Sequence, residues 1–493
     1  MFHTLAKKSL PLSLIASAFV LTGCGSSDKN NAPTLTGNQS PTVLENTTLV
    51  GSYTANDVDG DALILSLSGE SSALFNLEQS GELSFKDAPD FEEVGDTTFS
   101  VTITATEQTN DKLNASLTIS ISLDDVKDTP DFAVVQTVSP DFLGSEVIYI
   151  DPVQQSVETG FYIKDASDYT LSTYKSDIYH IGRHKIDEIT KYNRAAPDVA
   201  LWSYSTQDSQ DSVSRNPYSL VSLNDNKAYL IRYGSGKVWI VNPQATQAED
   251  FKIGELDISH YAHNNANNTP TPSSAAILDG KLYIAMQRID DNWAPGIAYV
   301  AVFDTSTDTE IETNALADDE FKGIPLVGRN PLENSVITAN DKVYVTSRSS
   351  YSGTDLSLSR IEEITPEDYS VRNIIDAQAI PENESAVIKA SVIVSEEKGY
   401  FYSNQTFFSP EYHVKSTLHE FNPTTGAVIA SNIANTGDDA IVQLALDSAN
   451  FLWMGINNPT TPGVDIINTA DNTPEGTRLL TELTPSTIRF VEK

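Results

Sequence analysis

Three aspartates, each separated from the next by a single residue, form the best candidate for chemistry in this sequence. They lie in Asp57-Val58-Asp59-Gly60-Asp61. Carboxylates at this spacing converge on a hard cation where the chain turns, and Ca²⁺ takes about six to eight oxygen ligands. The spacing therefore predicts a calcium site at Asp57, Asp59 and Asp61. The alternative, a set of solvated surface carboxylates, stays open.

An EF-hand does not explain this cluster. With Asp57 as position 1 of the calcium loop, the glycine required at position 6 is Ala62. The bidentate glutamate required at position 12 is Ser68, and the following residues alternate like a strand rather than a helix. The site needs a β-framework instead.

A second set of polar residues follows copies of a repeated strand pattern later in the chain. Because these copies are equivalent, we expect their polar residues to gather around one end of a central channel. They form either ion pairs with acids of neighbouring repeats or a polar pocket for an anionic or multi-polar ligand. The set is His180, Arg183, His184, Arg232, Arg288 and Arg348.

Motifs of common hydrolases are missing from the sequence. It contains no Gly-x-Ser-x-Gly nucleophile elbow and no His-Glu-x-x-His zinc motif. No catalytic residue is predicted, and we expect a protein that is not an enzyme.

The first 24 residues form an export signal. Lys7 and Lys8 precede an apolar run from Leu10 to Val20, which at 11 residues is too short to span a bilayer. The run ends in Leu21-Thr22-Gly23-Cys24, which resembles a bacterial lipobox. The resemblance implies removal of residues 1–23 and lipidation of Cys24, the only cysteine. Gly25 implies an outer-membrane lipoprotein, facing the periplasm or the cell surface. Residues 24–31 are a polar tether.

Residues 32–131 are predicted to form an antiparallel β-sandwich. Apolar and polar residues alternate in Leu63–Leu67, Phe99–Ala105 and Leu117–Ile121, with Gly, Asp and Asn between the runs. From Asp28 to Asp131 the segment carries 19 acidic residues against 4 lysines. Acids at this density favour cation binding.

The same segment resembles a bacterial cadherin-like repeat. The resemblance rests on Leu44-Glu45-Asn46, Ala55–Asp59, Ser80–Leu83, Pro89–Glu92 and the acidic exit Leu123–Pro130. It implies Ca²⁺ at the domain ends, with ligands Glu45, Asp90, Glu92, Asp125 and Asp128 at the exit. Asp28–Pro33 resembles a degenerate copy of the exit linker, placed to meet Asp57 and Asp59. Lys127, Thr129 and Glu107 depart from the family pattern.

Residues 132–493 repeat one unit, in which an aromatic-containing strand is followed by a turn and a companion strand. The first strands begin 50 to 61 residues apart, which suits the four-stranded blades of a β-propeller. They are Asp177–Ile181, Lys227–Ile231, Lys281–Ala285, Lys342–Thr346, Lys398–Tyr402 and Asn450–Met454. The copies around Tyr229 and Tyr344 resemble YVTN-type propellers of secreted bacterial proteins.

Six units are visible, and the chain ends predict a seventh. Thr487–Val491 lacks a companion strand, and Glu146–Asp151 looks like a companion without a first strand. Joining these two segments closes a seventh blade and removes both open edges. We therefore expect an all-β chain, a cadherin- or Ig-like sandwich followed by a propeller of seven blades, with six as the alternative.

Charge narrows the function classes. Lys and Arg total 31 against 68 Asp and Glu, which excludes a nucleic-acid binder because such proteins need a basic surface. The expected function is a lipid-anchored, calcium-binding surface protein with a ligand-binding or adhesive propeller, attached to a membrane and to an unknown ligand, polymer or transporter. Alternatives are a ligand-capture lipoprotein that assists an outer-membrane transporter, and a propeller enzyme of lactonase or quinoprotein type.

Overall fold

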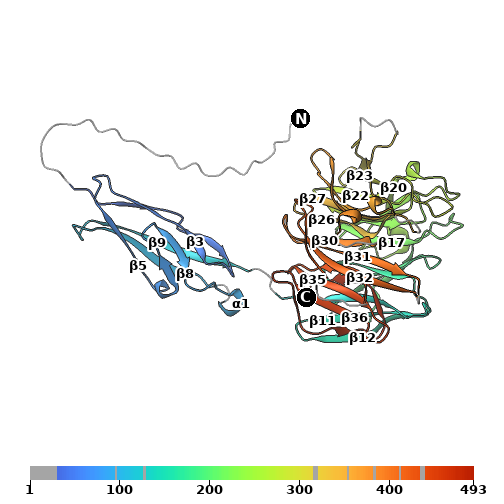
Figure 1. The fold of residues 1–493 in the computed structure, drawn as a ribbon, viewed down its shortest axis with the longest axis horizontal. Coiled ribbons are helices and arrows are strands. Elements are labelled where there is room, and N and C mark those ends of the chain that lie inside the picture. Colours follow the sequence, from blue (N-terminus) through green and yellow to red (C-terminus); the bar gives the residue numbers. More distant parts are fainter. Residues whose placement is uncertain are drawn as a thin grey trace. The chain divides into compact units, whose positions relative to one another are not determined.

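The structure is a computed structural model that divides the chain into two compact units, Met1–Val126 and Lys127–Lys493 (Figure 1). Cys24, the rest of the predicted export signal and Asp128 lie outside the described residues. In the part of the chain that is described, no helix has the length and apolar character needed to cross a bilayer. The described residues are 30–94, 97–125, 129–314, 320–351, 355–380, 385–409, 412–433 and 439–492.

The first unit is a β-sandwich. One sheet has the order β2 (Thr42–Leu44), β9 (Asn114–Asp124), β8 (Phe99–Glu107) and β5 (Leu63–Ser68). A second has the order β3 (Leu49–Ser52), β7 (Glu82–Phe85) and β6 (Phe75–Leu77). A third pairs β1 (Thr34–Thr36) with β4 (Thr54–Asn56), and the one short α-helix described, α1, spans Phe91–Val94.

Alternation along the strands builds the core of this unit. Every second residue of β8 is buried, because successive side chains of a strand point to opposite faces. Phe75, Phe85 and Phe99 pack together, with ring centroids 4.3 to 6.1 Å apart. The acidic loop described below lies at the other end of β8, where Glu107 pairs with Leu63 of β5.

The second unit contains, within its described residues, seven antiparallel sheets of four or five strands. The first sheet holds β13 (Tyr169–Tyr174), β14 (Asp177–Gly182), β15 (Glu188–Asn193) and β16 (Trp202–Ser205), and the second holds β17 (Pro217–Asn224), β18 (Lys227–Arg232), β19 (Lys237–Val241) and β20 (Lys252–Asp257). The third holds β21 (Pro272–Leu278), β22 (Lys281–Met286), β23 (Tyr299–Asp304), β24 (Thr309–Glu310) and β25 (Ile324–Pro325). The fourth holds β26 (Pro331–Ala339), β27 (Lys342–Arg348), β28 (Ser359–Ile364) and β29 (Val371–Asp376), and the fifth holds β30 (Val387–Ile393), β31 (Gly399–Phe407), β32 (His413–Phe421) and β33 (Val428–Ser431).

The sixth sheet holds β34 (Ala440–Leu446), β35 (Phe451–Asn457), β36 (Gly463–Asn468), β37 (Thr473–Pro474) and β38 (Leu479–Leu480). The seventh joins β39 (Thr484–Phe490), β10 (Ala133–Val138), β11 (Ser145–Asp151) and β12 (Ser156–Lys164). Single-turn 3₁₀ segments lie at Ser72–Leu74, Ala248–Asp250, Ser259–Tyr261, Leu356–Leu358 and Ala377–Ala379.

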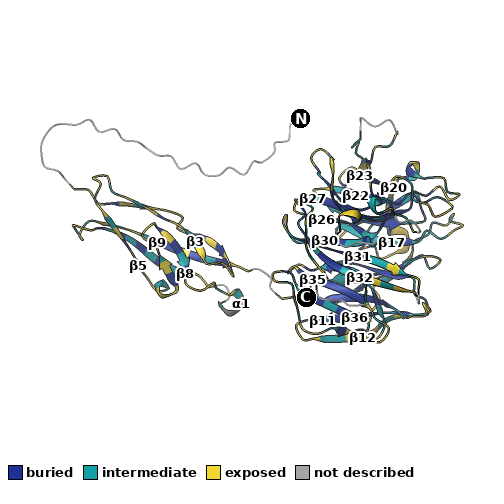
Figure 2. Cartoon of the chain, in the orientation of Figure 1, coloured by how far each residue is buried: buried dark blue, intermediate teal, exposed yellow. Residues whose placement is uncertain are grey.

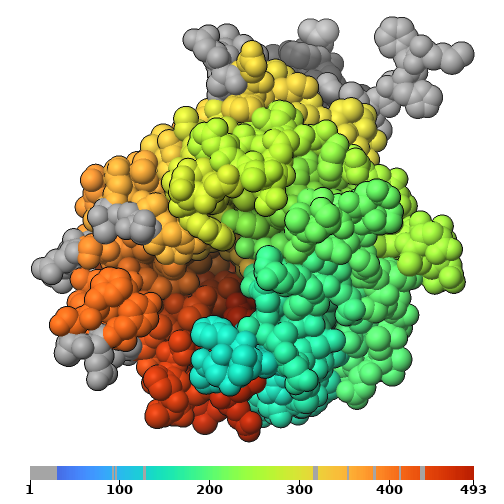
Figure 3. Space-filling view, turned by 90° about the vertical axis from the view of Figure 1, so that its right-hand side faces the viewer, coloured from blue at the N-terminus to red at the C-terminus, as the bar shows by residue number. Residues whose placement is uncertain are grey.

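The sheets form a ring around a hollow (Figure 3). The innermost strands β13, β17, β21, β26, β30, β34 and β39 contact one another in chain order, and β39 contacts β13. The middle strands of the sheets are largely buried (Figure 2). The aromatic-containing strands found in the sequence are the second strands of the first six sheets, and the innermost strands carry no comparable motif.

The predicted route of ring closure is wrong in one respect. The C-terminal strand β39 does not pair with the segment 146–151. It pairs with β10, and β10 lies between it and β11. The run Ala133–Thr137 has no aromatic residue and includes Gln136, a fully buried amide that donates to the carbonyls of Thr137 and Glu146. The repeat pattern is therefore missing from this strand.

The repeated Lys-x-Tyr pair joins neighbouring sheets. Lys227 Nζ donates to Thr305 O of the next sheet at 2.8 Å, and Tyr229 donates to Asp308 at 2.8 Å. Lys281 reaches Pro366 O of its next sheet at 3.1 Å in the same way. Lys398 and Tyr400 likewise bond Thr469 O and Asn472 of the sixth sheet. The motif thus satisfies turn carbonyls across sheet boundaries.

Two buried histidines make the propeller sensitive to acid. His180 and His419 are 2% and 3% exposed, and burial lowers the pKa of His180 to about 3 and of His419 to about 4. The unfolded chain takes up these protons near pH 6.5 and the folded chain does not, so the free energy of unfolding falls as the pH falls below 6.5.

We predict that His419→Gln removes part of this loss of stability at acidic pH. His419 hydrogen-bonds Ser403 and Ser431, so the variant is less stable than the wild type at pH 7. Between pH 7 and pH 5 that difference should narrow by about 2 kcal/mol. Urea unfolding at both pH values measures it, with His413→Gln, an exposed histidine of the same strand, as the control. A difference that stays constant with pH contradicts the prediction.

Candidate functional site

The acidic loop of the first unit connects β4 to β5. Gly60 has φ +85°, a conformation open to glycine, and it lets the loop turn back on itself. Asp57 Oδ1 accepts from the backbone N–H groups of Asp59 and Asp61 at 2.8 and 3.2 Å. The register of β5 on β8 pairs Leu63 with Glu107, which places Glu107 beside the loop.

Three carboxylates converge here: oxygens of Asp57, Asp61 and Glu107 lie within 4.8 Å of one another. Glu107 is 2% exposed. Its Oε2 accepts from Asn30 at 2.7 Å, whereas its Oε1 and Asp57 Oδ2 are buried without a hydrogen-bond partner. Asp59 points elsewhere and accepts from Asn31, through the backbone at 2.7 Å and through Nδ2. The oxygen donor set and its two unpartnered oxygens fit a hard cation.

The residues expected at the exit do not form a comparable group among the described residues. Glu45 is 1% exposed, and its Oε2 accepts from the N–H of Phe91 at 2.5 Å, beside Asp90 at the start of α1. Asp125 is exposed. The side chain of Glu92, like all of Asp128, is outside the described part. Glu45 here binds the backbone of α1.

At the channel end of the propeller, Arg183 binds acids from two sheets. Its guanidinium lies 2.7 Å from Asp168 and 2.5 Å from Glu333, and it stands over the ring of Tyr218. Burial alone would lower the pKa of Arg183, but the carboxylates of Glu333 and Asp168 outweigh it and raise the pKa. The nearby His184 is exposed, and its N–H donates to Asp168.

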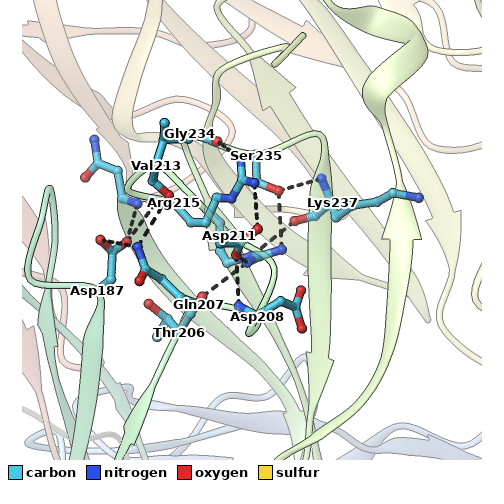
Figure 4. Close-up of polar contacts among 12 residues, drawn as sticks. Asp187, Thr206, Gln207, Asp208, Asp211, Val213, Arg215, Gly234, Ser235 and Lys237 are labelled. Carbon is cyan, nitrogen blue, oxygen red and sulfur yellow. Dashed lines mark hydrogen bonds and ion pairs between the residues drawn. The ribbon is translucent and has the colours of Figure 1, made fainter. Parts of the chain in front are cut away.

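Arg232 belongs to a polar network with Thr206, Asp211 and Ser235, which are labelled in Figure 4. It is 1% exposed, donates to Thr206 O at 3.1 Å and to Ser235, and lies 3.5 Å from Asp211. Asp211 also binds Arg215 at 2.6 Å. Burial lowers the pKa of Arg232 to about 10, so it keeps its charge at neutral pH. The network fixes the loop between β16 and β17.

The remaining predicted residues differ in whether their side chains have hydrogen-bond partners within the protein. Arg288 donates to Tyr261 O at 2.7 Å and to Ile297 O at 3.1 Å. His180 lies within β14 rather than in a turn, and its Nε2 is 3.0 Å from Gln136 Oε1. Arg348, in contrast, has a buried Nε without a partner and contacts the ring of Tyr351. The fold therefore uses most of this set as internal contacts.

A segment that the sequence did not reveal crosses the channel. Between Pro331 and Val336 the register of β26 shifts by several residues, so that residues 332–335, the cross-channel segment, leave the sheet. Glu333 accepts from Thr170 of β13 at 2.8 Å and from Arg183, and Asn334 accepts from Arg489 of β39. Two sheets separate β26 from each of these strands in the ring order. The segment thus spans the channel.

The channel contains a cavity of about 910 Å³. All seven innermost strands line it, each with a polar residue: Ser172, Ser219, Ser274, Asn334, Lys389, Gln443 and Ser486, together with Arg489. Six of these strands carry a register shift. Four of them skip a single residue, which in β30 is Lys389, and β17 skips one residue at each of two positions. Bulges re-aim side chains and are common beside functional sites.

The comparisons with known proteins agree with both units. Residues 30–122 match the bacterial Ig domain family. No curated protein matched the sequence.

Solved structures resemble the propeller at low identity. A candidate 6-phosphogluconolactonase from Bacteroides fragilis is 11% identical, with 74% of this chain and 99% of that chain covered and a TM-score of 0.48. A protein from Lactobacillus plantarum is 13% identical, over 74% of this chain and 100% of its own, with a TM-score of 0.47. The Dos1 propeller is 10% identical, with 74% and 89% covered and a TM-score of 0.44. These likenesses concern the fold alone. The prediction of an all-β chain, an Ig-like domain followed by a β-propeller, is confirmed.

Proposed function

We propose that this chain is an exported, lipid-anchored binding protein. Its seven-bladed propeller binds a small ligand in the central channel, and its cadherin-like Ig domain binds calcium. The observation that carries the proposal is the channel cavity of about 910 Å³, lined by polar side chains from every innermost strand. Its volume lies in the range of small-molecule sites, about 300 to 1,000 Å³.

The cavity favours capture of a small ligand over adhesion to a polymer. An adhesive propeller offers its outer faces, whereas here the polar side chains point inward and the cross-channel segment spans the same channel. A capture protein must then hand its ligand to a further protein. The partner we propose is a transporter of the outer membrane.

The calcium proposal rests on uncompensated charge in the acidic loop. Asp57, Asp61 and Glu107 bring three carboxylates together around two buried oxygens that have no partner. Like charges at this distance repel in a buried setting, and a divalent cation removes the repulsion. Calcium suits the all-oxygen donor set, and backbone carbonyls and water can complete its coordination.

Export and anchoring are supported by the leader. The basic and apolar runs, followed by Leu21-Thr22-Gly23-Cys24, provide a cleavage signal and an acceptor thiol in one place. Multiple acyl chains hold a water-exposed protein firmly at a bilayer. We propose attachment to the outer membrane on its periplasmic or cell-surface side.

The binding function predicts a retained ligand. Native mass spectrometry of residues 25–493, produced in a secretory compartment, should show an added mass of a small organic molecule that disappears on denaturation. Binding to intact cells or purified polysaccharide without any small-molecule adduct would instead support adhesion and count against the channel proposal.

The calcium site predicts opposite effects of Glu107→Gln with and without the ion. In chelator the variant's Ig-like unit should melt higher than the wild type, because the buried one of three repelling charges is gone. With Ca²⁺ at a hundredfold excess over its Kd, the wild type should gain roughly 3 kcal/mol and the variant much less. Calorimetry of the intact chain measures the melting of this unit with and without Ca²⁺, and Glu82→Gln, at an exposed position, is the matched control. Identical wild-type melting in both conditions would overturn the site.

The anchor predicts that Cys24→Ser releases the protein. The wild type should incorporate labelled fatty acid and sediment with membranes, and the variant should do neither because the acceptor thiol is gone. Acylation that persists in the variant would contradict the lipobox assignment.

A further inference from the structure

Lys389 brings an ammonium group into the channel without an internal counter-ion. The register shift in β30 pairs Ile388 with Ser403 and Ala390 with Tyr402, which leaves Lys389 as the extra residue of a β-bulge. Its partly buried side chain lines the cavity. Among the described residues it makes no ion pair and no hydrogen bond. A charge in this position is costly unless something else neutralises it.

Arg348 adds a second uncompensated cation at the same place. Its charge acts on Lys389 and on Tyr402, a residue that also lines the cavity. The guanidinium contacts the ring of Tyr351, and its buried Nε has no acceptor. Burial lowers the pKa of Arg348, and the rings of Tyr351 and Tyr402 offset this only in part. The positive charge of Arg348 therefore adds to that of Lys389.

Arg489 contributes positive charge from the closing strand β39. It lines the cavity, and it donates to Ile488 O and to Asn334 of the cross-channel segment. Two partners leave part of its five-donor guanidinium unused. The nearest acid that acts on it is Glu333, whose two oxygens are already engaged by Thr170 and Arg183.

Several other cations of the propeller are paired with acids. Lys191 lies 2.7 Å from Asp177, Lys227 lies 2.7 Å from Asp308, and Arg232 has Asp211. In a chain of net charge −37, acids are abundant, so their absence around Lys389 and Arg348 is specific to this place. Unpaired buried cations in a cavity attract anions more strongly than surface cations do, because water screens them less.

We propose that the channel binds a small organic anion, a carboxylate or a phosphate ester, at Lys389 and Arg489 of the cavity lining, where the charge of Arg348 acts on Lys389 and adds to the positive potential. The hydroxyl and amide side chains that line the cavity accommodate a polar remainder of this ligand. The inference rests on the binding function proposed above and names the ligand class for that site.

Proton linkage gives the site a pH dependence. Burial, assisted by Arg348, lowers the pKa of Lys389 to about 7. The charged and titratable groups that face this region are Arg348 from β27, Tyr402 from β31, Arg489 from β39 and Glu333 from β26. Above pH 7 the free Lys389 loses its charge, so binding an anion requires proton uptake, and affinity falls as the pH rises from 7 to 9.

The test uses two probes on the intact chain, citrate for carboxylates and inorganic phosphate for phosphate esters. Titration calorimetry should detect binding of at least one of them, weaker at pH 9 than at pH 6.5. Lys389→Met and Arg348→Met should each weaken it by about tenfold to a hundredfold. Lys415→Met removes an equal charge from an exposed position of the same sheet and should bind as the wild type does.

A stability measurement separates loss of the site from loss of the fold. Without anion, Lys389→Met should melt higher than the wild type, because it removes an uncompensated charge. Failure of both probes to bind, or equal binding by Lys389→Met and Lys415→Met, overturns the anion site. A neutral molecule retained in native mass spectrometry would leave the binding function standing and overturn only the ligand class, whereas an empty channel that binds neither probe would remove both.

Discussion

The pairing of β39 with β10 is the interaction on which the rest of the propeller depends. It joins the C-terminal strand to the first strand of the unit, and it completes the seventh sheet of the ring. It also places Thr487 beside Thr170 and carries Arg489 to the channel. Both the far attachment of the cross-channel segment and one wall of the cavity are therefore products of this single strand pairing.

Each unit has one place where charged groups lack an internal partner. These groups are acidic in the Ig-like unit and basic in the propeller. In the Ig-like unit, Asp57 and Glu107 bury oxygens that find no donor, and in the propeller Lys389 and Arg348 bury cations that find no acid. Elsewhere the fold pairs such groups, as it does for Arg183 and Arg232. Natural sequences depart from internal satisfaction mainly at functional sites, where stability is given up for binding.

The fold was largely predictable from sequence, whereas the site was predictable only in part. Two patterns indicate strands: the alternation seen in β8 and the repeated Lys-x-Tyr pair. Both reflect the burial of strand side chains, which recurs from sheet to sheet. The innermost strands line a channel and carry small polar residues, so they leave no such pattern. The spacing of Asp57 and Asp61 made these two residues predictable, whereas Glu107 joins the site only through the pairing register of β5 and β8. Lys389 and residues 332–335 depend on bulges, which no local signal in the sequence marks.

Because the closing strand is also the end of the propeller, the order of synthesis determines when the ring can exist. Ribosomes deliver the chain from the N-terminus, and six of the seven sheets can assemble from contiguous segments as they emerge. The seventh waits for residues 484–490, and until then the edge of β10 that pairs with β39 has no partner strand. An exported chain must stay unfolded while it is translocated, and a fold that completes only with its final strand delays premature closure.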